Sequence, residues 1–389
     1  MANTHRTTYQ TVGLPTDKAS AKGSEHLVRR EKASAASGIL NVWPCSDLYL
    51  RPVRSFTADR HLFSDALLID VRSPAEFAKG HIPGAVHLPL FSDLEREEVG
   101  TLYKKQGKAI ATRKGIEFTS VKLPQFVAKV DEWTNGKDKH LRLYCWRGGM
   151  RSGSMAWLLH TAGYRTEVLE GGYKAFRKWG SSLFRAHWNL RILTGYTGSG
   201  KTEVLQELKA LGAQVIDLED LAAHRGSSFG GLGKGVQPST EQFQNRLIEA
   251  LTQMDPELPL WLEDESIRIG QCHLPDLFFD QMKESQWVRM ERPREFRLKH
   301  LVDLYGSADP LELEQAIRRL QKRLGGERMN ECLHELRQGA LQRTAALLLD
   351  YYDKSYELSM KERDPDLGTA LEFKKENHQA IARTLRNLS

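Results

Sequence analysis

The stretch LRILTGYTGSGKTEVLQELKALGAQVIDL, residues 190–218, has the pattern of a strand, a glycine-rich loop, a helix and a second strand. Its loop matches the Gly-x-x-x-x-Gly-Lys-Thr pattern of phosphate-binding P-loops. In such a loop, backbone amides and a helix N-terminus attract phosphate, a lysine adds positive charge, and a hydroxyl can hold magnesium. The predicted diphosphate-binding residues are Gly195, Gly198, Ser199, Gly200, Lys201 and Thr202.

Acidic residues follow the next apolar strand, in the segment LWLEDES. The segment is similar to a Walker B strand, in which a carboxylate orients a metal ion or its water. Neighbouring strand side chains point to opposite faces, so Glu263, Asp264 and Glu265 all remain candidates. These residues could bind Mg²⁺, but the sequence assigns no definite metal site. The segment LAAHRGSSFGG adds His224 and Arg225 as lining of the same cleft, with a plain connecting loop as the equal alternative.

A second reactive constellation surrounds one cysteine. The segment YCWRGGMRSG places Cys145 between an apolar strand and a loop that leads into a helix. Loop amides and two arginines favour the thiolate over the thiol, and paired glycines let the amides curl around an anion. We therefore predict a nucleophile of lowered pKa beside an oxyanion site. Its catalytic residues are Cys145, Arg147 and Arg151, and Gly148 and Gly149 shape the loop.

Strands and helices alternate through both regions, which predicts an α/β fold with parallel sheets. We expect a flexible extension at residues 1–57, a first sheet domain at 58–181 and a P-loop domain at 188–290. Residues 291–389 are expected to be mainly helical and basic, because apolar residues recur there at helical spacing.

Composition restricts the classes of protein. Hydrophobic residues make up 40% and charged residues 27% of the chain, as in globular proteins. No apolar stretch reaches the ~20 residues of a membrane helix, so we expect a cytoplasmic protein without a membrane partner. The four cysteines are far apart in sequence, which argues against a disulfide framework and against Cys-x-x-Cys metal sites.

The net charge of +6 permits an anionic partner such as a nucleic acid. Arginines in the C-terminal region are the candidates for phosphate contacts, and an aromatic residue beside the cysteine could stack on an unpaired base. These candidate RNA-binding residues are Trp146, Arg292, Arg294, Arg297, Arg318, Arg319 and Arg323.

Three segments, in order, resemble the rhodanese family: IDVRSPAEFAKGHIPGAVHLP, YCWRGGMRS and LEGGYKAFRKW. The resemblance implies a rhodanese-like fold and a sulfur- or selenium-carrying Cys145 that passes through a persulfide-like state. Asp70 and Arg72 would brace the loop, and His81 and His87 would be structural. Five residues separate Cys145 from Arg151, a spacing that resembles phosphatases of rhodanese fold. A phosphatase or sulfurtransferase coupled to an NTPase is therefore the alternative.

A rhodanese-like region followed by a P-loop region and a basic helical region resembles the tRNA 2-selenouridine synthase family. Further similar segments are LPLFSDLEREEVGTLYKKQG, GIEFTS, LAAHRGSSFGG and WLEDESIRIG. The resemblance implies that wobble 2-thiouridine in tRNA is geranylated from geranyl diphosphate and then receives selenium from selenophosphate. It implies no tightly bound cofactor and a transient encounter with the enzyme that supplies selenophosphate. A nucleotide-switched RNA binder without enzymatic activity is a second alternative.

Overall fold

A computed structural model describes residues 53–63, 65–135, 140–361 and 363–388. Most of the expected N-terminal extension, together with Cys45, lies outside the described residues. The described part contains two five-stranded sheets, and every strand pair in them is parallel. This arrangement confirms the predicted α/β class.

The first sheet has the strand order β1-β5-β4-β2-β3 and carries the cysteine segment. Its strands are β1 Arg54–Phe56, β2 Leu67–Asp70, β3 Val86–His87, β4 His140–Tyr144 and β5 Arg165–Leu169. Its helices are α1 Pro74–Lys79, α2 Asp93–Gln106, α3 Lys108–Ser120, α4 Leu123–Thr134, α5 Met150–Thr161 and α6 Gly172–Arg185, with a 3₁₀ helix at Arg60–Phe63. The sheet starts before residue 58, because β1 pairs with the edge of β5.

The second sheet has the order β12-β11-β6-β8-β7 and carries the P-loop. Its strands are β6 Leu190–Thr194, β7 Gln214–Ile216, β8 Leu260–Glu263, β11 Gln286–Glu291 and β12 Gly368–Glu372. The helices around it are α7 Lys201–Ala210, α8 Leu218–Leu221, α9 Thr240–Thr252, α10 Asp276–Glu284 and α16 His378–Arg386. A short antiparallel pair, β9 Arg268–Ile269 and β10 Cys272–His273, stands apart from both sheets.

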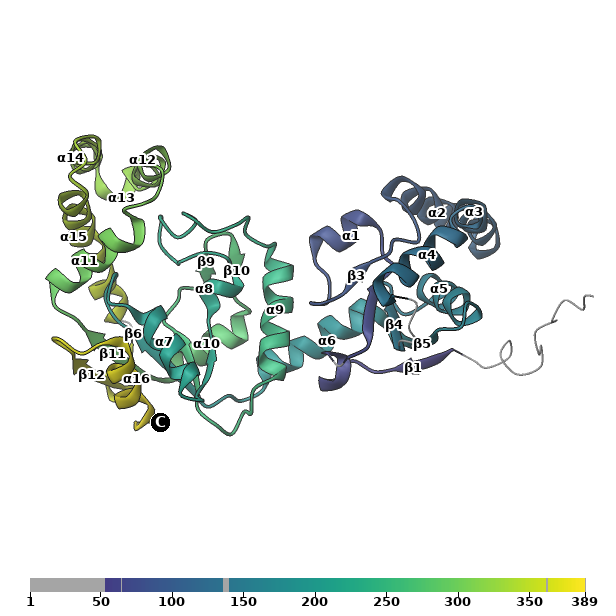
Figure 1. Ribbon diagram of the computed structural model, residues 1–389, viewed down its shortest axis with the longest axis horizontal. Helices are drawn as coiled ribbons and strands as arrows, with labels where there is room; N and C mark the ends of the chain where they lie inside the picture. The colour runs from purple at the N-terminus through teal and green to yellow at the C-terminus, as the bar shows by residue number, and fades with distance from the viewer. Residues whose placement is uncertain (1–52, 64, 136–139, 362, 389) are drawn as a thin grey trace, which may run out of the picture. The chain divides into compact units, whose positions relative to one another are not determined.

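A helical segment interrupts the second sheet between β11 and β12. It consists of α11 Arg294–Tyr305, α12 Pro310–Arg319, α13 Gln321–Leu324, α14 Gly326–Arg337 and α15 Leu341–Met360. The chain then returns through a 3₁₀ helix at Pro365–Leu367: β12 pairs along β11, and α16 packs on α7 (Figure 1). The region after residue 291 is thus mainly helical, as predicted, but its end belongs to the P-loop sheet.

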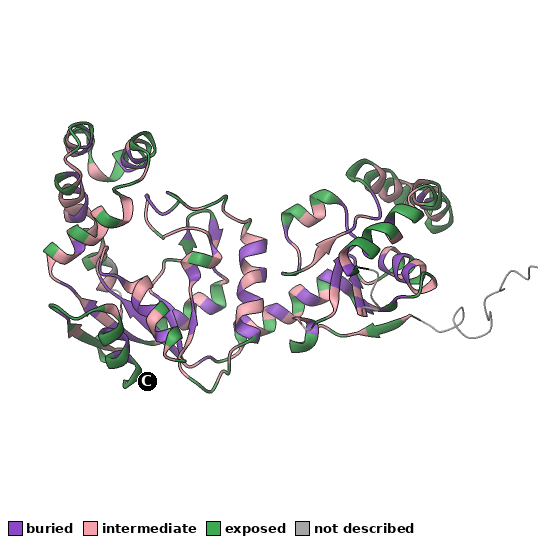
Figure 2. Cartoon of the chain, viewed as in Figure 1, coloured by how far each residue is buried: buried purple, intermediate pink, exposed green. Residues whose placement is uncertain are grey.

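Buried residues follow the strands of both sheets and one side of α9 (Figure 2). The side chains of Phe243, Leu247 and Ile248 on α9 are fully buried, and they belong to one apolar cluster with Tyr173 and Phe176 of α6. Helix α9 therefore joins the two α/β regions through a shared core. Within the described part of the chain, no helix is both long enough and apolar enough to cross a membrane.

Candidate active sites

Cys145 lies at the carboxyl end of β4, the central strand of the first sheet. Two groups donate to its sulfur at 3.3 Å: the backbone N–H of Gly149 and the hydroxyl of Ser152. Gly148 has φ 63°, and a Cβ there would lie 2.4 Å from the carbonyl oxygen of Leu169. Glycine is therefore required for the loop to close over the sulfur.

The surroundings of Cys145 separate it from the other described cysteines. Burial by itself raises the pKa of the Cys145 thiol, but hydrogen bonds from Ser152 and loop amides, with the charge of Arg151, lower that pKa overall. Burial raises the pKa of both Cys272 and Cys332 to about 11. Cys145 is consequently the described cysteine best suited to act as a nucleophile.

Asp70 and Arg72 lie beneath the loop, where the resemblance placed them. They form a fully buried ion pair with an N–O distance of 2.6 Å, and Arg72 also donates to the carbonyl oxygen of Gly80. The guanidinium of Arg72 stacks 3.9 Å from the ring centroid of Tyr173, whose N–H donates to the carbonyl oxygen of Cys145. The pair therefore acts on the loop through Tyr173.

The two loop arginines differ in their environment. Arg147 is exposed, so its charge is available to an incoming anion. Arg151 forms an ion pair with Glu76 at 2.6 Å, and this pair lowers the pKa of the Glu76 carboxyl against the effect of burial. Ser152, which the sequence reasoning missed, contacts the sulfur directly. A hydroxyl residue in the first turn after the cysteine loop was the available signal.

The P-loop has the geometry that its motif predicts. Gly198 and Gly200 adopt positive φ angles of 80° and 83°, and Gly200 caps the N-terminus of α7. The Nζ of Lys201 donates to the carbonyl oxygen of Gly195 at 3.0 Å, folded over the loop. The hydroxyl of Ser199 is buried without a partner, which leaves a donor for a bound anion.

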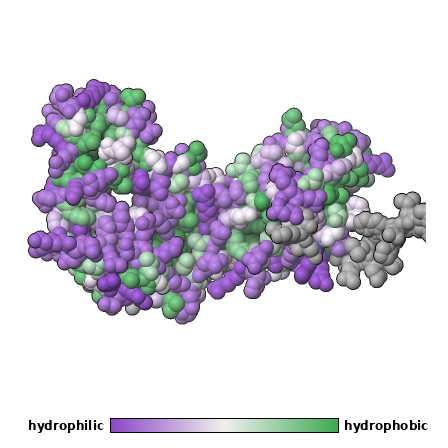
Figure 3. Space-filling view, viewed as in Figure 1, coloured by the Kyte–Doolittle hydropathy of each residue, from purple (hydrophilic) through white to green (hydrophobic). Residues whose placement is uncertain are grey.

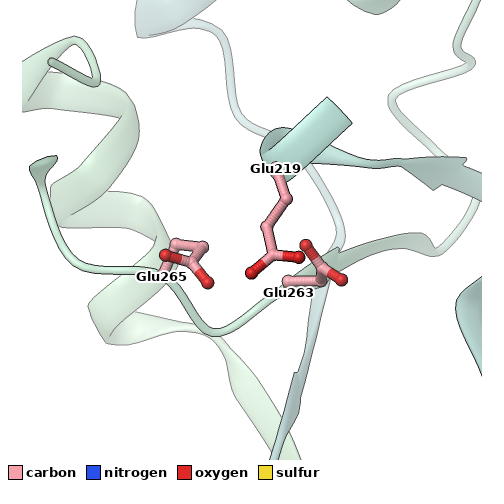
Figure 4. Close-up of side chains that lie close together, drawn as sticks. All are labelled: Glu219, Glu263 and Glu265. Carbon is pink, nitrogen blue, oxygen red and sulfur yellow. The ribbon is translucent and has the colours of Figure 1, made fainter. Parts of the chain in front are cut away.

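Three glutamates lie close together (Figure 4), and the P-loop residue Thr202 contacts two of them. One carboxylate oxygen from each of Glu219, Glu263 and Glu265 lies within 4.8 Å of the others. Thr202 donates to Glu263 at 2.8 Å, whereas the second oxygen of Glu263 is buried without a partner. Glu219, at the start of α8, lies in no motif, and only the fold brings it here.

This carboxylate cluster is electrostatically unfavourable by itself. Burial, followed by mutual repulsion, raises the pKa of Glu263 and of Glu265 well above the ordinary value. A divalent cation would neutralise this charge, and carboxylate oxygens are the ligands that Mg²⁺ prefers. The carboxylate of Asp264 has partners other than these glutamates. It accepts a hydrogen bond from the hydroxyl of Thr194 and forms an ion pair with Arg363. Of the three candidates from the segment LWLEDES, Glu263 and Glu265 thus belong to the carboxylate cluster and Asp264 does not.

A cavity of about 860 Å³ opens over the P-loop and the carboxylates. Arg225 lines it, and its Nη1 also donates to the carbonyl oxygen of Leu232 at 2.9 Å. His224 is not among the lining residues, and burial lowers the pKa of its imidazole. The lining comes entirely from residues after Leu193, so this cavity and the Cys145 loop are separate sites.

The structure corrects part of the RNA-binding prediction. Arg297 is 6% exposed and forms a two-pronged ion pair with Asp353, while Arg292 is 7% exposed and stacks on Phe296. Both side chains stabilise the fold, because at this degree of burial they are not accessible to a phosphate backbone.

The other predicted RNA contacts reach solvent to different extents. Arg294 is half-buried and pairs with Asp350, and Arg318 is half-exposed and pairs with Glu314. Arg319, Arg323 and Trp146 are exposed, so they stay predictions.

Comparisons with known proteins match both α/β regions of the chain. A rhodanese-like domain model matches residues 57–178, and a model described as the tRNA 2-selenouridine synthase AAA domain matches residues 188–387. A protein from Shewanella sp. (strain MR-7) named tRNA 2-selenouridine synthase is 36% identical over 76% of this chain and 88% of its own length.

Two further proteins carry the same name. The one from Marinobacter nauticus is 34% identical over 78% of this chain and 91% of its own length. The one from Nitrosomonas europaea is 38% identical over 66% and 67% of the two chains. With both domain models matched in order and this similarity along most of its length, the chain belongs to the tRNA 2-selenouridine synthase family.

Proposed function

We propose that this protein converts wobble 2-thiouridine in tRNA to 2-selenouridine in two steps, the first using geranyl diphosphate and the second selenophosphate. The observation that carries the proposal is the presence of a thiol of lowered pKa and a separate cavity lined by a P-loop in one chain of this family. The order of the steps follows from leaving-group chemistry. A thione sulfur departs poorly, whereas an S-alkyl group can depart as a thiolate.

The P-loop is the proposed site of geranyl transfer. A bond forms between the geranyl carbon and the uridine sulfur, and the carbon–oxygen bond to diphosphate breaks. Lys201 and the amides of the P-loop would stabilise the negative charge that develops on the departing diphosphate. Mg²⁺ bound by Glu219, Glu263 and Glu265 beside Thr202 would supply further positive charge there.

The Cys145 loop is the proposed site of selenium transfer. A bond forms between the selenium of selenophosphate and C2 of the uridine, the geranyl group leaves C2 as a thiolate, and water cleaves the phosphorus–selenium bond to release phosphate. Cys145 is 3% exposed, at the base of a loop whose amides face inward, so a small anion such as selenophosphate fits better than a nucleobase. Arg147 would attract that anion. Trp146, which is 37% exposed at the rim, is available to stack on the uridine.

The contacts of Arg151 bear on the phosphatase alternative. A phosphatase would need this arginine to hold the transferred phosphoryl group, but Glu76 already engages it through both guanidinium nitrogens. This pairing favours a role in which Arg151 positions the loop and contributes charge at a distance.

Nucleoside analysis of tRNA tests the proposal. A strain that lacks its own family member is complemented with the wild type, Lys201→Ala, Cys145→Ala, or the control Cys332→Ala, which changes a buried cysteine far from the loop. We expect 2-selenouridine with the wild type and the control. Lys201→Ala should stop at 2-thiouridine, and Cys145→Ala should accumulate the geranylated nucleoside.

Other outcomes would favour the alternatives. If both variants stop at the same nucleoside, the two sites do not divide the steps as proposed. If Cys145→Ala leaves 2-selenouridine intact, the protein is not the selenium-transferring enzyme. Phosphate release from a phosphoester by the wild type, lost in Cys145→Ser, would indicate the phosphatase.

A further inference from the structure

A second, smaller cavity of about 80 Å³ adjoins the P-loop cavity. The two cavities share lining residues, among them Thr197 of the P-loop, Leu301 and Tyr305 of α11, and Tyr352 of α15. The smaller cavity therefore lies directly beside the P-loop cavity, where the hydrocarbon part of a ligand bound through its phosphates would be placed.

Most of the residues that line the smaller cavity are apolar, and its hydroxyl groups are those of Thr197, Ser227, Tyr305, Thr344 and Tyr352. Leu313 and Ile317 of α12, Leu336 of α14 and Leu348 of α15 contribute buried side chains. The hydroxyl of Thr344 donates to the carbonyl oxygen of Ala340, just before α15, so it offers no free donor. In the space-filling view, hydrophobic residues are visible among the hydrophilic ones that cover these helices (Figure 3).

This chemistry selects between kinds of diphosphate. The ribose and base of a nucleotide carry polar groups that would lose their hydrogen bonds to water in such a cavity, at a cost in free energy. A hydrocarbon chain has no such groups and gains free energy from leaving water. The occupant that fits a phosphate-binding loop beside a mostly apolar cavity is a diphosphate ester with a short hydrocarbon chain.

The walls and the volume set a limit on that chain. Residues of α12 and α14 line only the smaller cavity, so these helices close the end away from the P-loop. Its volume is about half of the ~150 Å³ of an apolar cavity that binds benzene. The cavity therefore holds the end of a short chain, and a longer chain meets the wall.

We infer that the helical segment between β11 and β12 forms a chain-length-selecting pocket for the hydrocarbon part of the diphosphate substrate. The inference rests on the proposed function and adds the site that recognises the substrate class. It also gives the helical segment a role in substrate choice besides any contact with tRNA.

Substitution on α15 tests the pocket. Ala345 lines the cavity, whereas the adjacent Ala346 does not, so Ala345→Phe fills the cavity and Ala346→Phe is the matched control. Calorimetry would measure binding of inorganic pyrophosphate and of the dimethylallyl, geranyl and farnesyl diphosphates to the full chain. We expect Ala345→Phe to weaken geranyl diphosphate at least about tenfold and to leave pyrophosphate unchanged. The control should match the wild type.

Because Ala345→Phe could fail to fold, a second variant that enlarges the cavity tests the inference independently. Leu336→Ala enlarges the cavity, and Leu333→Ala truncates a buried leucine of α14 that does not line it. We expect Leu336→Ala alone to shift preference toward farnesyl diphosphate. The inference is overturned if geranyl diphosphate binds the wild type but neither lining variant changes the preference among chains. If the wild type binds pyrophosphate and nucleotides but no prenyl diphosphate, the proposed function itself fails.

Discussion

Cys145 and Ser152 show how single side chains set reactivity at the first site. The hydroxyl of Ser152 is fully buried and donates to the sulfur, and a hydrogen bond to the charged form stabilises the thiolate. Burial by itself raises the pKa of the Cys145 thiol, and the Ser152 hydrogen bond, the loop amides and the charge of Arg151 together lower it.

Ser152→Ala should therefore raise the pKa of Cys145. The rate of iodoacetamide alkylation should fall at pH 7 and reach its half-maximum at a higher pH than in the wild type, since only the thiolate reacts. The control is Ser154→Ala, which changes an exposed serine of the same helix. An unchanged pH profile in Ser152→Ala would show that the loop amides suffice.

Glu263→Gln should reveal the repulsion among the clustered carboxylates. Because the folded-state pKa of Glu263 is raised, the native protein binds more protons than the unfolded chain above about pH 4.5. The cation-free protein therefore loses stability as the pH rises from about 4.5 through the raised pKa of Glu263. We expect the variant to be more stable at pH 8, by about 1.4 kcal/mol for each pKa unit relieved.

Thermal unfolding with and without Mg²⁺ measures this effect. The cation should raise the Tm of the wild type and change that of Glu263→Gln less, since one of three ligands has lost its charge. Glu257→Gln, at an exposed site, is the control. If divalent cations leave the Tm of the wild type unchanged, the three glutamates do not form a metal site.

At this scale, the sequence allows a prediction where residues that are close in the chain form the candidate site. Cys145 and Lys201 were proposed because a glycine-rich loop and a helix lie within a few residues of each. Glu219 was missed because only the fold brings it to Glu263, and Arg297 was misassigned because its partner Asp353 lies 56 residues later.

At the scale of elements, α9 is one of the links between the two α/β regions, beside α10, whose Gln281 donates to the carbonyl oxygen of Phe184 in α6. Asn245 of α9 is fully buried; it donates to the hydroxyl of Tyr173 and to the carbonyl oxygen of His81, and accepts from Arg177. The backbone N–H of Tyr173 donates to the carbonyl oxygen of Cys145. Tyr173 therefore connects α9 with the cysteine loop.

Asn245→Ala should destabilise the protein by about 1–3 kcal/mol for each buried group left without a partner. The measurement is urea-induced unfolding, with the free energy of unfolding compared between variant and wild type. Gln253→Ala, exposed just after the same helix, should change it little. Equal stability of the two variants would mean that α9 joins the regions through its apolar contacts alone.

For the whole molecule, the return of the chain to the second sheet is the decisive feature. The α/β class and both parallel sheets could be predicted from the alternation of strands and helices. The return could not: β12 is five residues long with a largely exposed, partly polar sequence, so it carries no buried-strand pattern. Only its pairing with β11 defines it.

Ile381→Ala should show that the last helix belongs to the P-loop region. Ile381 is fully buried in a cluster with Val204 and Leu208 of α7. Truncation of a buried isoleucine costs about 2–5 kcal/mol, so urea unfolding should occur at a clearly lower concentration. Leu388→Ala, at a half-exposed site, is the control. Equal midpoints for both variants would mean that α16 is dispensable for the second sheet.

The return of the chain also sets an order for folding during synthesis. All strands of the cysteine-bearing sheet have left the ribosome once Leu169 emerges, so that half can fold early. The other half waits, because β11 remains an open sheet edge until residues 368–372 have been translated. A ribosome stalled anywhere in the helical segment would therefore display a finished thiol site beside an unfinished diphosphate site.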